Sequence, residues 1–139
     1  MITQLHEADL DLVLDFKLRK FEASGRCKLP AGWKASSLDS YVDLYRDGKC
    51  RHLGYRVDDN IVALAGALIC EGSPFLSTQT MRHGLTIDEY VLPEYRNRGI
   101  GQRLRRELLV WLAEKGACLG ATVPPNLARL ACACGSHRL

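Results

Sequence analysis

A strand-like segment that leads through a glycine- and arginine-rich turn into a long helix constrains the fold of this chain most. The segment LTIDEYVL (85–92) is strand-like, and Pro93 ends it because proline cannot donate a hydrogen bond to a sheet. From about Gly99 to Lys115 the helical period returns, and Gly116 is a natural C-terminal stop. The apolar stripe of this helix is Ile100, Leu104, Leu108, Trp111 and Leu112.

Two helices are predicted before this unit. The first has an apolar stripe made of Leu10, Val13, Leu14, Leu18 and Phe21. A loop is expected over residues 24–37, and a second helix in SLDSYVDLYRDG (37–48). Ser36 or Ser37 is the expected N-cap of the second helix, and Gly48 its expected end.

Three further strands are predicted. The first, over residues 52–57, is expected to be half-buried, because an apolar set of residues alternates with a more polar set. The alternating sets are Leu53, Tyr55 and Val57 on one face and His52, Gly54 and Arg56 on the other. A tight turn at residues 58–60 leads into IVALAGALIC (61–70), which is expected to be a fully buried strand. After a loop at 71–84 and the unit described above, CLGATV (118–123) is a short strand, and NLARLACACG (126–135) suggests a last helix.

This order of elements predicts a mixed α/β domain on one sheet, and the 139 residues suit one domain, 1–139. Net charge is +3 and charged residues make up 25%, an ordinary globular composition. No apolar run approaches the roughly 20 residues of a membrane helix. The N-terminus has no basic region followed by an apolar stretch, so we expect a cytoplasmic protein that is not membrane-bound.

The cysteines do not indicate a metal site. Six are present without a CxxC pair, and Cys70 and Cys118 lie in apolar stretches typical of core residues. Cys132 and Cys134, together with His137, could in principle bind a soft metal. Reduced thiols in a cytoplasmic protein are the favoured interpretation, and no metal is predicted.

The turn before the long helix has the features of an anion-binding site. A helix N-terminus exposes unpaired N–H groups, and the helix dipole adds partial positive charge. Gly99 and Gly101 lack the Cβ atoms that would keep a phosphate away from the backbone, and Arg96 and Arg98 can add charge-assisted hydrogen bonds. The chain lacks the third glycine of the dinucleotide-binding fingerprint and the GK[ST] of the P-loop. A diphosphate cradle of another kind is therefore predicted.

The same stretch resembles the acetyl-coenzyme A signature of the GCN5-related N-acetyltransferases. The pattern V-x-P-x-Y-R-x-R-G-x-G-x-x-L runs from Val91 to Leu104, and its core, [RQ]-x-x-G-x-[GA], is residues 96–101. ITQLHEADLDLVLDFKLRKF is similar to the family's opening strand and first helix, and residues 52–70 to its second and third strands. The resemblance implies an α/β (α+β) fold with a mixed, mostly antiparallel sheet flanked by helices. It also implies that the C-terminal region is shortened.

The resemblance implies that acetyl-coenzyme A is the cosubstrate. The strand before the turn would splay from its neighbour, and its backbone would pair with the pantetheine arm and polarise the thioester carbonyl. The N–H groups of residues 97–102 would hold the diphosphate. The implied contact residues are Tyr90, Val91, Leu92, Arg96, Asn97, Arg98, Gly99, Ile100, Gly101, Gln102 and Asn126.

The implied reaction is direct transfer of the acetyl group from sulfur to a primary amine in a ternary complex, helped by a base. Glu89 and Asp88 are the candidate bases, since they are adjacent on a strand and point to opposite faces. Alternatively, either carboxylate is solvated or paired with an arginine. The family often uses a tyrosine in the last helix as acid. NLARLACACGSHRL has none, and Cys132, Cys134 or Ser136 could replace it.

Other functions remain open at this point. A degenerate or truncated member could bind coenzyme A, or dimerise, without efficient catalysis. Nucleic-acid binding is disfavoured because no aromatic stacking platform accompanies the arginines. An exposed sheet edge at 118–123 suggests a homodimer. The acceptor, an amine on a small molecule or a peptide, would lie between the loops at 24–36 and 71–84 and the C-terminal segment.

Overall fold

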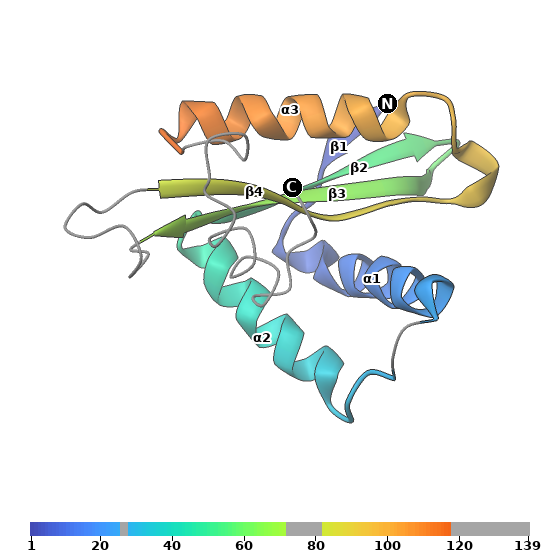
Figure 1. Ribbon diagram of the computed structural model, residues 1–139, viewed down its shortest axis with the longest axis horizontal. Coiled ribbons are helices and arrows are strands. Elements are labelled where there is room, and N and C mark those ends of the chain that lie inside the picture. Colours follow the sequence, from blue (N-terminus) through green and yellow to red (C-terminus); the bar gives the residue numbers. More distant parts are fainter. Residues whose placement is uncertain (26–27, 72–81, 118–139) are drawn as a thin grey trace.

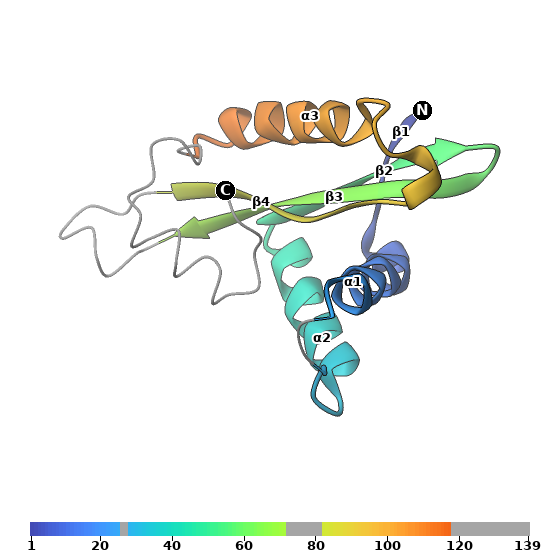
Figure 2. The same ribbon diagram turned by 45° about the vertical axis from the view of Figure 1, so that its right-hand side comes forward.

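The computed structural model describes residues 1–25, 28–71 and 82–117 of the chain. Its elements form three layers, with α3 on one face of a single sheet and α1 and α2 on the other (Figures 1 and 2). The helices are α1 (Leu10–Ser24), α2 (Trp33–Arg46) and α3 (Ile100–Glu114), and short 3₁₀ turns cover Glu7–Asp9 and Pro93–Tyr95. The strands are β1 (Ile2–Gln4), β2 (Cys50–Val57), β3 (Asn60–Glu71) and β4 (Arg82–Val91).

The sheet has the order β1-β2-β3-β4, and every neighbouring pair is antiparallel. β2 and β3 are joined by a turn in which Asp58 and Asp59 have φ angles of 47° and 67°. Two successive residues with positive φ are typical of a type I′ turn, whose twist matches that of the strands it joins. The mixed α/β fold with a mostly antiparallel sheet and flanking helices is thus confirmed, as is the tight turn.

β4 contains an irregularity that matters for the site. Its register with β3 shifts between Leu64 and Gly66, so that Tyr90 pairs with Leu64 but Ile87 pairs with Gly66. Asp88 lies in this extra length of chain with a φ of 55°, in the left-handed region that non-glycine residues rarely adopt. β4 therefore carries a β-bulge, which redirects the side chains on either side of it.

Two apolar clusters hold the layers together. The predicted stripe of α3 packs against one face of β3, and all five of its residues are buried. On the other face, the predicted burial of the α1 stripe is confirmed for Leu10, Val13 and Leu14. It is wrong for Leu18, which is exposed. Phe16 is buried instead, because its ring meets the edge of the Tyr90 ring on β4, 6.2 Å between centroids.

Two predicted boundaries are also wrong. α2 begins at Trp33 after Gly32, which has a φ of 80°, so Ser36 and Ser37 lie inside the helix and do not cap it. The turn of helix before them is fixed by Trp33, which packs against the core. β4 begins at Arg82, because Arg82 pairs with Glu71 across the two strands and donates to its carboxylate.

The elements predicted at 118–123 and 126–135 lie outside the described residues. In the part of the chain that is described, no helix is long and apolar enough to cross a membrane.

The α3 stripe generates a prediction about stability. Leu108 is completely buried at its centre, whereas Val110 is 54% exposed on the same helix. Leu108→Ala should lower the free energy of unfolding by about 2–5 kcal/mol, because it leaves a cavity between α3 and the sheet. Val110→Ala should change it by less than about 0.5 kcal/mol. Urea unfolding of both variants measures this, and equal losses would show that α3 is not packed as described.

Candidate active site

The turn between β4 and α3 leaves a row of backbone N–H groups without partners. Gly99 is the N-cap of α3 with a φ of 77°, and Asn97 has a φ of 64°. The first hydrogen bond of the helix runs from the Arg103 N–H to the Gly99 carbonyl, 3.1 Å. Among the described residues, the N–H groups of residues 97–102 have no hydrogen-bond acceptor. Together with the helix dipole they form a surface suited to an anion.

The two glycines of the turn do different things. A Cβ atom on Gly99 would meet nothing within 4 Å, so glycine is favoured there by its positive φ and not by a close contact. A Cβ atom on Gly101 would lie 2.8 Å from Oε1 of Glu89. Gly101 therefore makes room for the Glu89 carboxylate on the strand below, a role that the sequence did not reveal.

Both arginines of the turn bind backbone carbonyls. Arg96 donates from Nε to the Val91 carbonyl, 2.9 Å, and its guanidinium lies over the Tyr90 ring at 5.3 Å. Arg98 donates to the Glu94 carbonyl, 3.1 Å. Both side chains are exposed, so each can exchange its carbonyl for an anion at the rim of the turn.

The outer edge of β4 has no strand beside it among the described residues. The Leu92 N–H bonds to the Val62 carbonyl of β3, 2.9 Å. In an antiparallel pair, alternate residues point their N–H and C=O groups toward and away from the partner strand, so Glu89 and Val91 face outward. Their carbonyls accept hydrogen bonds from Lys20 and Arg96 respectively, which agrees with this assignment. The predicted contacts of Tyr90, Val91 and Leu92 with pantetheine stay predictions, and Val91 is the one of the three whose backbone faces the open edge.

The candidate bases contact opposite layers, as the alternation along a strand predicted. Glu89 faces α3 and pairs with Arg105, at 2.5 Å. It is partly exposed, with 30% of its side chain accessible. Asp88 turns toward α1 and α2 and is buried, at 2% exposure.

Asp88 belongs to a buried polar network. Its Oδ2 accepts hydrogen bonds from the Tyr41 hydroxyl at 2.5 Å and from Nε2 of His52 at 2.9 Å. Lys17 lies 3.4 Å from Oδ1 and donates to the Tyr41 hydroxyl at 2.9 Å. The other ring nitrogen of His52 lies 2.7 Å from the Tyr45 hydroxyl. α1, α2, β2 and β4 thus meet at one carboxylate.

The network keeps Asp88 ionised. Burial alone would raise its pKa, but hydrogen bonding and charge from His52, with Lys17 and Tyr41, outweigh burial and hold the pKa well below its usual range. A carboxylate with such a low pKa is a poor proton acceptor near neutral pH. Asp88 is therefore better suited to hold the bulge of β4 than to act as a base.

The sequence did not predict this network. Alternation placed His52 on the polar face of a half-buried strand, but β2 is covered on both faces and His52 is completely buried. Its ring lies against β3 where Gly66 leaves space, since a Cβ atom there would come within 2.6 Å of Cδ2 and Nε2 of His52. A glycine inside an apolar strand was the only signal for a close contact of this kind.

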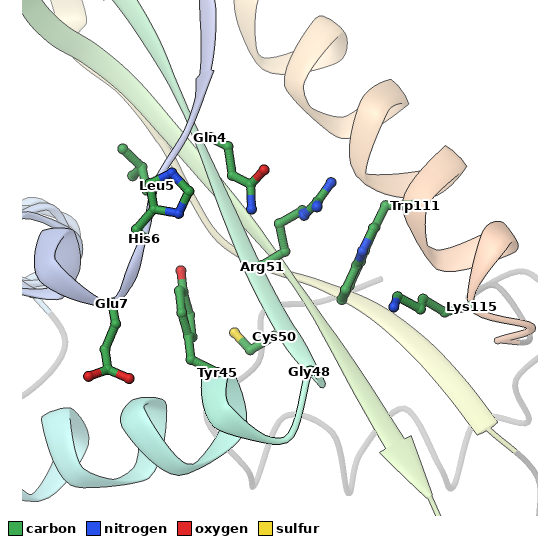
Figure 3. A pocket seen from close by; sticks show the side chains of 10 residues that line it. All are labelled: Gln4, Leu5, His6, Glu7, Tyr45, Gly48, Cys50, Arg51, Trp111 and Lys115. Atoms are coloured by element: carbon green, nitrogen blue, oxygen red, sulfur yellow. The ribbon is translucent and has the colours of Figure 1, made fainter.

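A pocket of about 290 Å³ lies at the opposite, β1 edge of the sheet (Figure 3). The ends of α2 and α3 converge there with the start of β2. Arg51 lies over the Trp111 ring at 5.3 Å, and Lys115 lies 6.0 Å from the same ring. None of the residues of the turn or of β4 lines this pocket, but Tyr45, whose hydroxyl contacts His52 in the Asp88 network, does.

Asn126, Cys132, Cys134, Ser136 and His137 lie outside the described residues, and their roles stay predictions.

The sequence matches the model of a protein family, the acetyltransferase (GNAT) family, over residues 18–135. No curated protein matches it in sequence. Similar solved structures include a predicted acetyltransferase with acetyl-CoA from Clostridium acetobutylicum, 15% identical with a TM-score of 0.75, the match covering 100% of this chain and 90% of that one.

Two further solved structures are similar to this chain over nearly its whole length and nearly the whole of their own. A GCN5-related N-acetyltransferase from Ralstonia eutropha is 26% identical with a TM-score of 0.66, covering 100% of this chain and 93% of that one. An aminoglycoside antibiotic 6′-N-acetyltransferase from Acinetobacter haemolyticus is 20% identical with a TM-score of 0.63, covering 100% and 94%.

The buried network generates a prediction about acid stability. Because the folded-state pKa of Asp88 is lowered, its contribution to stability is present above about pH 4, the unfolded value, and is lost as the pH falls below it. Asp88→Asn should therefore cost about 3–5 kcal/mol near pH 7, and the difference from wild type should shrink toward pH 2.

Urea unfolding of wild type and variant across this pH range measures the difference. The control is Asp15→Asn, which removes the carboxylate of an exposed ion pair with Lys34 and should give a small, nearly constant difference. A pH-independent difference for Asp88→Asn would contradict the ionised state assigned to this residue.

Proposed function

The chain belongs to the acetyltransferase (GNAT) family, and we propose that it moves an acetyl group from acetyl-coenzyme A to a primary amine by direct attack in a ternary complex. The observation that carries the proposal is the meeting of two unpaired backbone surfaces. Within residues 1–25, 28–71 and 82–117, the N–H groups of residues 97–102 have no acceptor, and they lie at the end of a strand with no neighbour on its outer side. Acetyl-coenzyme A has groups that complement both surfaces. Its diphosphate can accept hydrogen bonds from the N–H groups of the turn, and the amides of its pantetheine arm can pair with the backbone of β4.

The residues of the turn and strand divide the binding between them. The N–H groups of residues 97–102 hold the diphosphate, and the outward-facing backbone of Val91 and Glu89 pairs with the amides of pantetheine, as an added strand would. Arg96 releases the Val91 carbonyl on binding and then lies free beside the turn to add charge. Acetyl-coenzyme A supplies a thioester that an amine can attack without an enzyme nucleophile.

Glu89 is the proposed base of the reaction. An alkyl ammonium group with a pKa of about 10 must lose a proton before it can attack. Of the two candidate carboxylates, Glu89 alone is partly exposed and lies at the open edge, where a water molecule can relay the proton. Asp88 acts as a positioning residue, because its network fixes the bulge that directs Glu89 toward α3.

Acceptor and assembly stay predictions. A primary amine on a small molecule or peptide is the expected acceptor, and aminoglycosides belong in a first panel because a similar structure is an aminoglycoside acetyltransferase. The homodimer and the cytoplasmic location expected from the sequence also stay predictions. Thermal stabilisation by acetyl-coenzyme A combined with thiol release across an amine panel tests the function. Stabilisation without release would favour the alternative, a member of the family that binds coenzyme A without efficient turnover.

The role of the turn can be tested with two glycines at opposite ends of α3. Gly99 and Gly116 have φ angles of 77° and 73°, and a Cβ atom on either would meet nothing within 4 Å. Substitution by alanine should strain both equally, at a cost of about 1–2 kcal/mol in stability. Only Gly99→Ala should weaken binding of acetyl-coenzyme A, by about tenfold or more, because only its methyl group enters the anion surface. Calorimetric titration measures the affinities, and equal affinities would remove the turn from the binding site.

The role of Glu89 can be tested by Glu89→Gln, which keeps the shape and can still accept from Arg105. We expect kcat to fall about 100-fold or more, with little change in the KM for acetyl-coenzyme A, because the proton acceptor is lost. Glu107→Gln, on the exposed face of α3, is the matched control. A Glu89→Gln variant as active as this control would rule out Glu89 as the base.

A further inference from the structure

Two lysines of α1 reach β4 from the same side of the helix. Lys17 and Lys20 are three residues apart, which places them one turn from each other on one helix face. Lys17 is held by the Asp88 carboxylate and the Tyr41 hydroxyl. Lys20 instead donates from Nζ to the backbone carbonyl of Glu89, 2.9 Å, and no carboxylate of the described residues lies within ion-pair distance of it.

The Glu89 carbonyl, like that of Val91, faces outward on the open edge of β4. The N–H and C=O groups of one residue in a strand point to the same side, so the Glu89 N–H faces outward beside the Lys20 amine. Under the proposed function, this edge binds pantetheine and polarises the thioester carbonyl. Lys20 therefore brings a primary amine to the place where the acceptor amine must attack.

We propose that Lys20 is itself an acetyl acceptor, which the enzyme acetylates from bound acetyl-coenzyme A when no external amine is present. The inference rests on the proposed function. After the Lys20 ammonium loses one proton to water, the nitrogen lone pair forms a bond to the thioester carbonyl carbon. The C–S bond then breaks, and a second proton passes from nitrogen to the departing thiolate. The products are Nε-acetyl-Lys20 and coenzyme A with a free thiol.

The surroundings of Lys20 favour the neutral amine that this step requires. Burial lowers its pKa first, and the nearby charge of Lys17 lowers it further, against the opposing charges of Asp88 and Glu89. Lys34 offers a contrast in the same protein, because its amine is exposed and pairs with Asp15. Lys34 therefore reports the background of chemical acetylation that any exposed lysine undergoes.

The test is peptide mass spectrometry of the whole chain incubated with acetyl-coenzyme A and no added amine. Lys20 should be acetylated about tenfold faster than Lys34 or more, because its amine is held beside the thioester. The rate at Lys20 should saturate with acetyl-coenzyme A, and it should fall toward that of Lys34 in Gly99→Ala. Lys20→Arg, which keeps a donor for the Glu89 carbonyl, should fold with an unchanged melting temperature and show no acetylation at residue 20.

The outcomes separate the inference from the function on which it rests. Binding of acetyl-coenzyme A and amine-dependent thiol release, without preferential labelling of Lys20, would overturn the inference and leave the proposed function standing. Equal labelling of Lys20 in wild type and Gly99→Ala would also overturn it, because the reaction would then be chemical. Absence of any stabilisation by acetyl-coenzyme A would overturn both.

Discussion

Asp88 joins side chains from both helices of one layer and from β2 at a single buried carboxylate, while its backbone forms the bulge of β4. A left-handed backbone at a non-glycine residue costs on the order of 1–3 kcal/mol and persists only where its surroundings hold it. An ionised carboxylate in a protein interior is in turn tolerated only with partners. The bulge and the network therefore depend on each other. Together they decide that Glu89 lies against α3 and that its carbonyl faces the open edge.

The parts of the fold that follow from a repeating pattern could be predicted from the sequence. The stripe of α3 repeats with the helical period over four turns, and the β2–β3 hairpin combines a long apolar run with a turn of three polar residues. The errors concern residues whose position is set by a distant partner. Phe16 replaces Leu18 in the core because of Tyr90, and α2 starts early because Trp33 packs inward. The repeating pattern of apolar residues within each helix does not reveal these contacts with residues far away in the sequence.

The candidate site shows the same division. The glycines, the arginines and the helix start of the turn are adjacent in the sequence, so an anion surface could be inferred from them. That Asp88 and Glu89 face opposite layers also follows from strand alternation. What they touch does not, because Tyr41, His52, Lys17 and Arg105 come from four different elements. The different tasks of Gly99 and Gly101 likewise depend on where Glu89 lies in space.

The close approach of Gly66 to His52 extends the influence of the network into the middle of the sheet. A methyl group on Gly66 would push the imidazole away from Asp88 or force β3 to shift. Either change would reach the bulge of β4, because Gly66 borders the register shift and pairs with Ile87. A map of tolerated substitutions would accordingly group Gly66 with the residues of the candidate active site. Gly66 lies inside β3, and its nearest side chain is His52. A position in the interior of this protein can therefore be intolerant to mutation because it supports the Asp88 network, and not only because it packs the core.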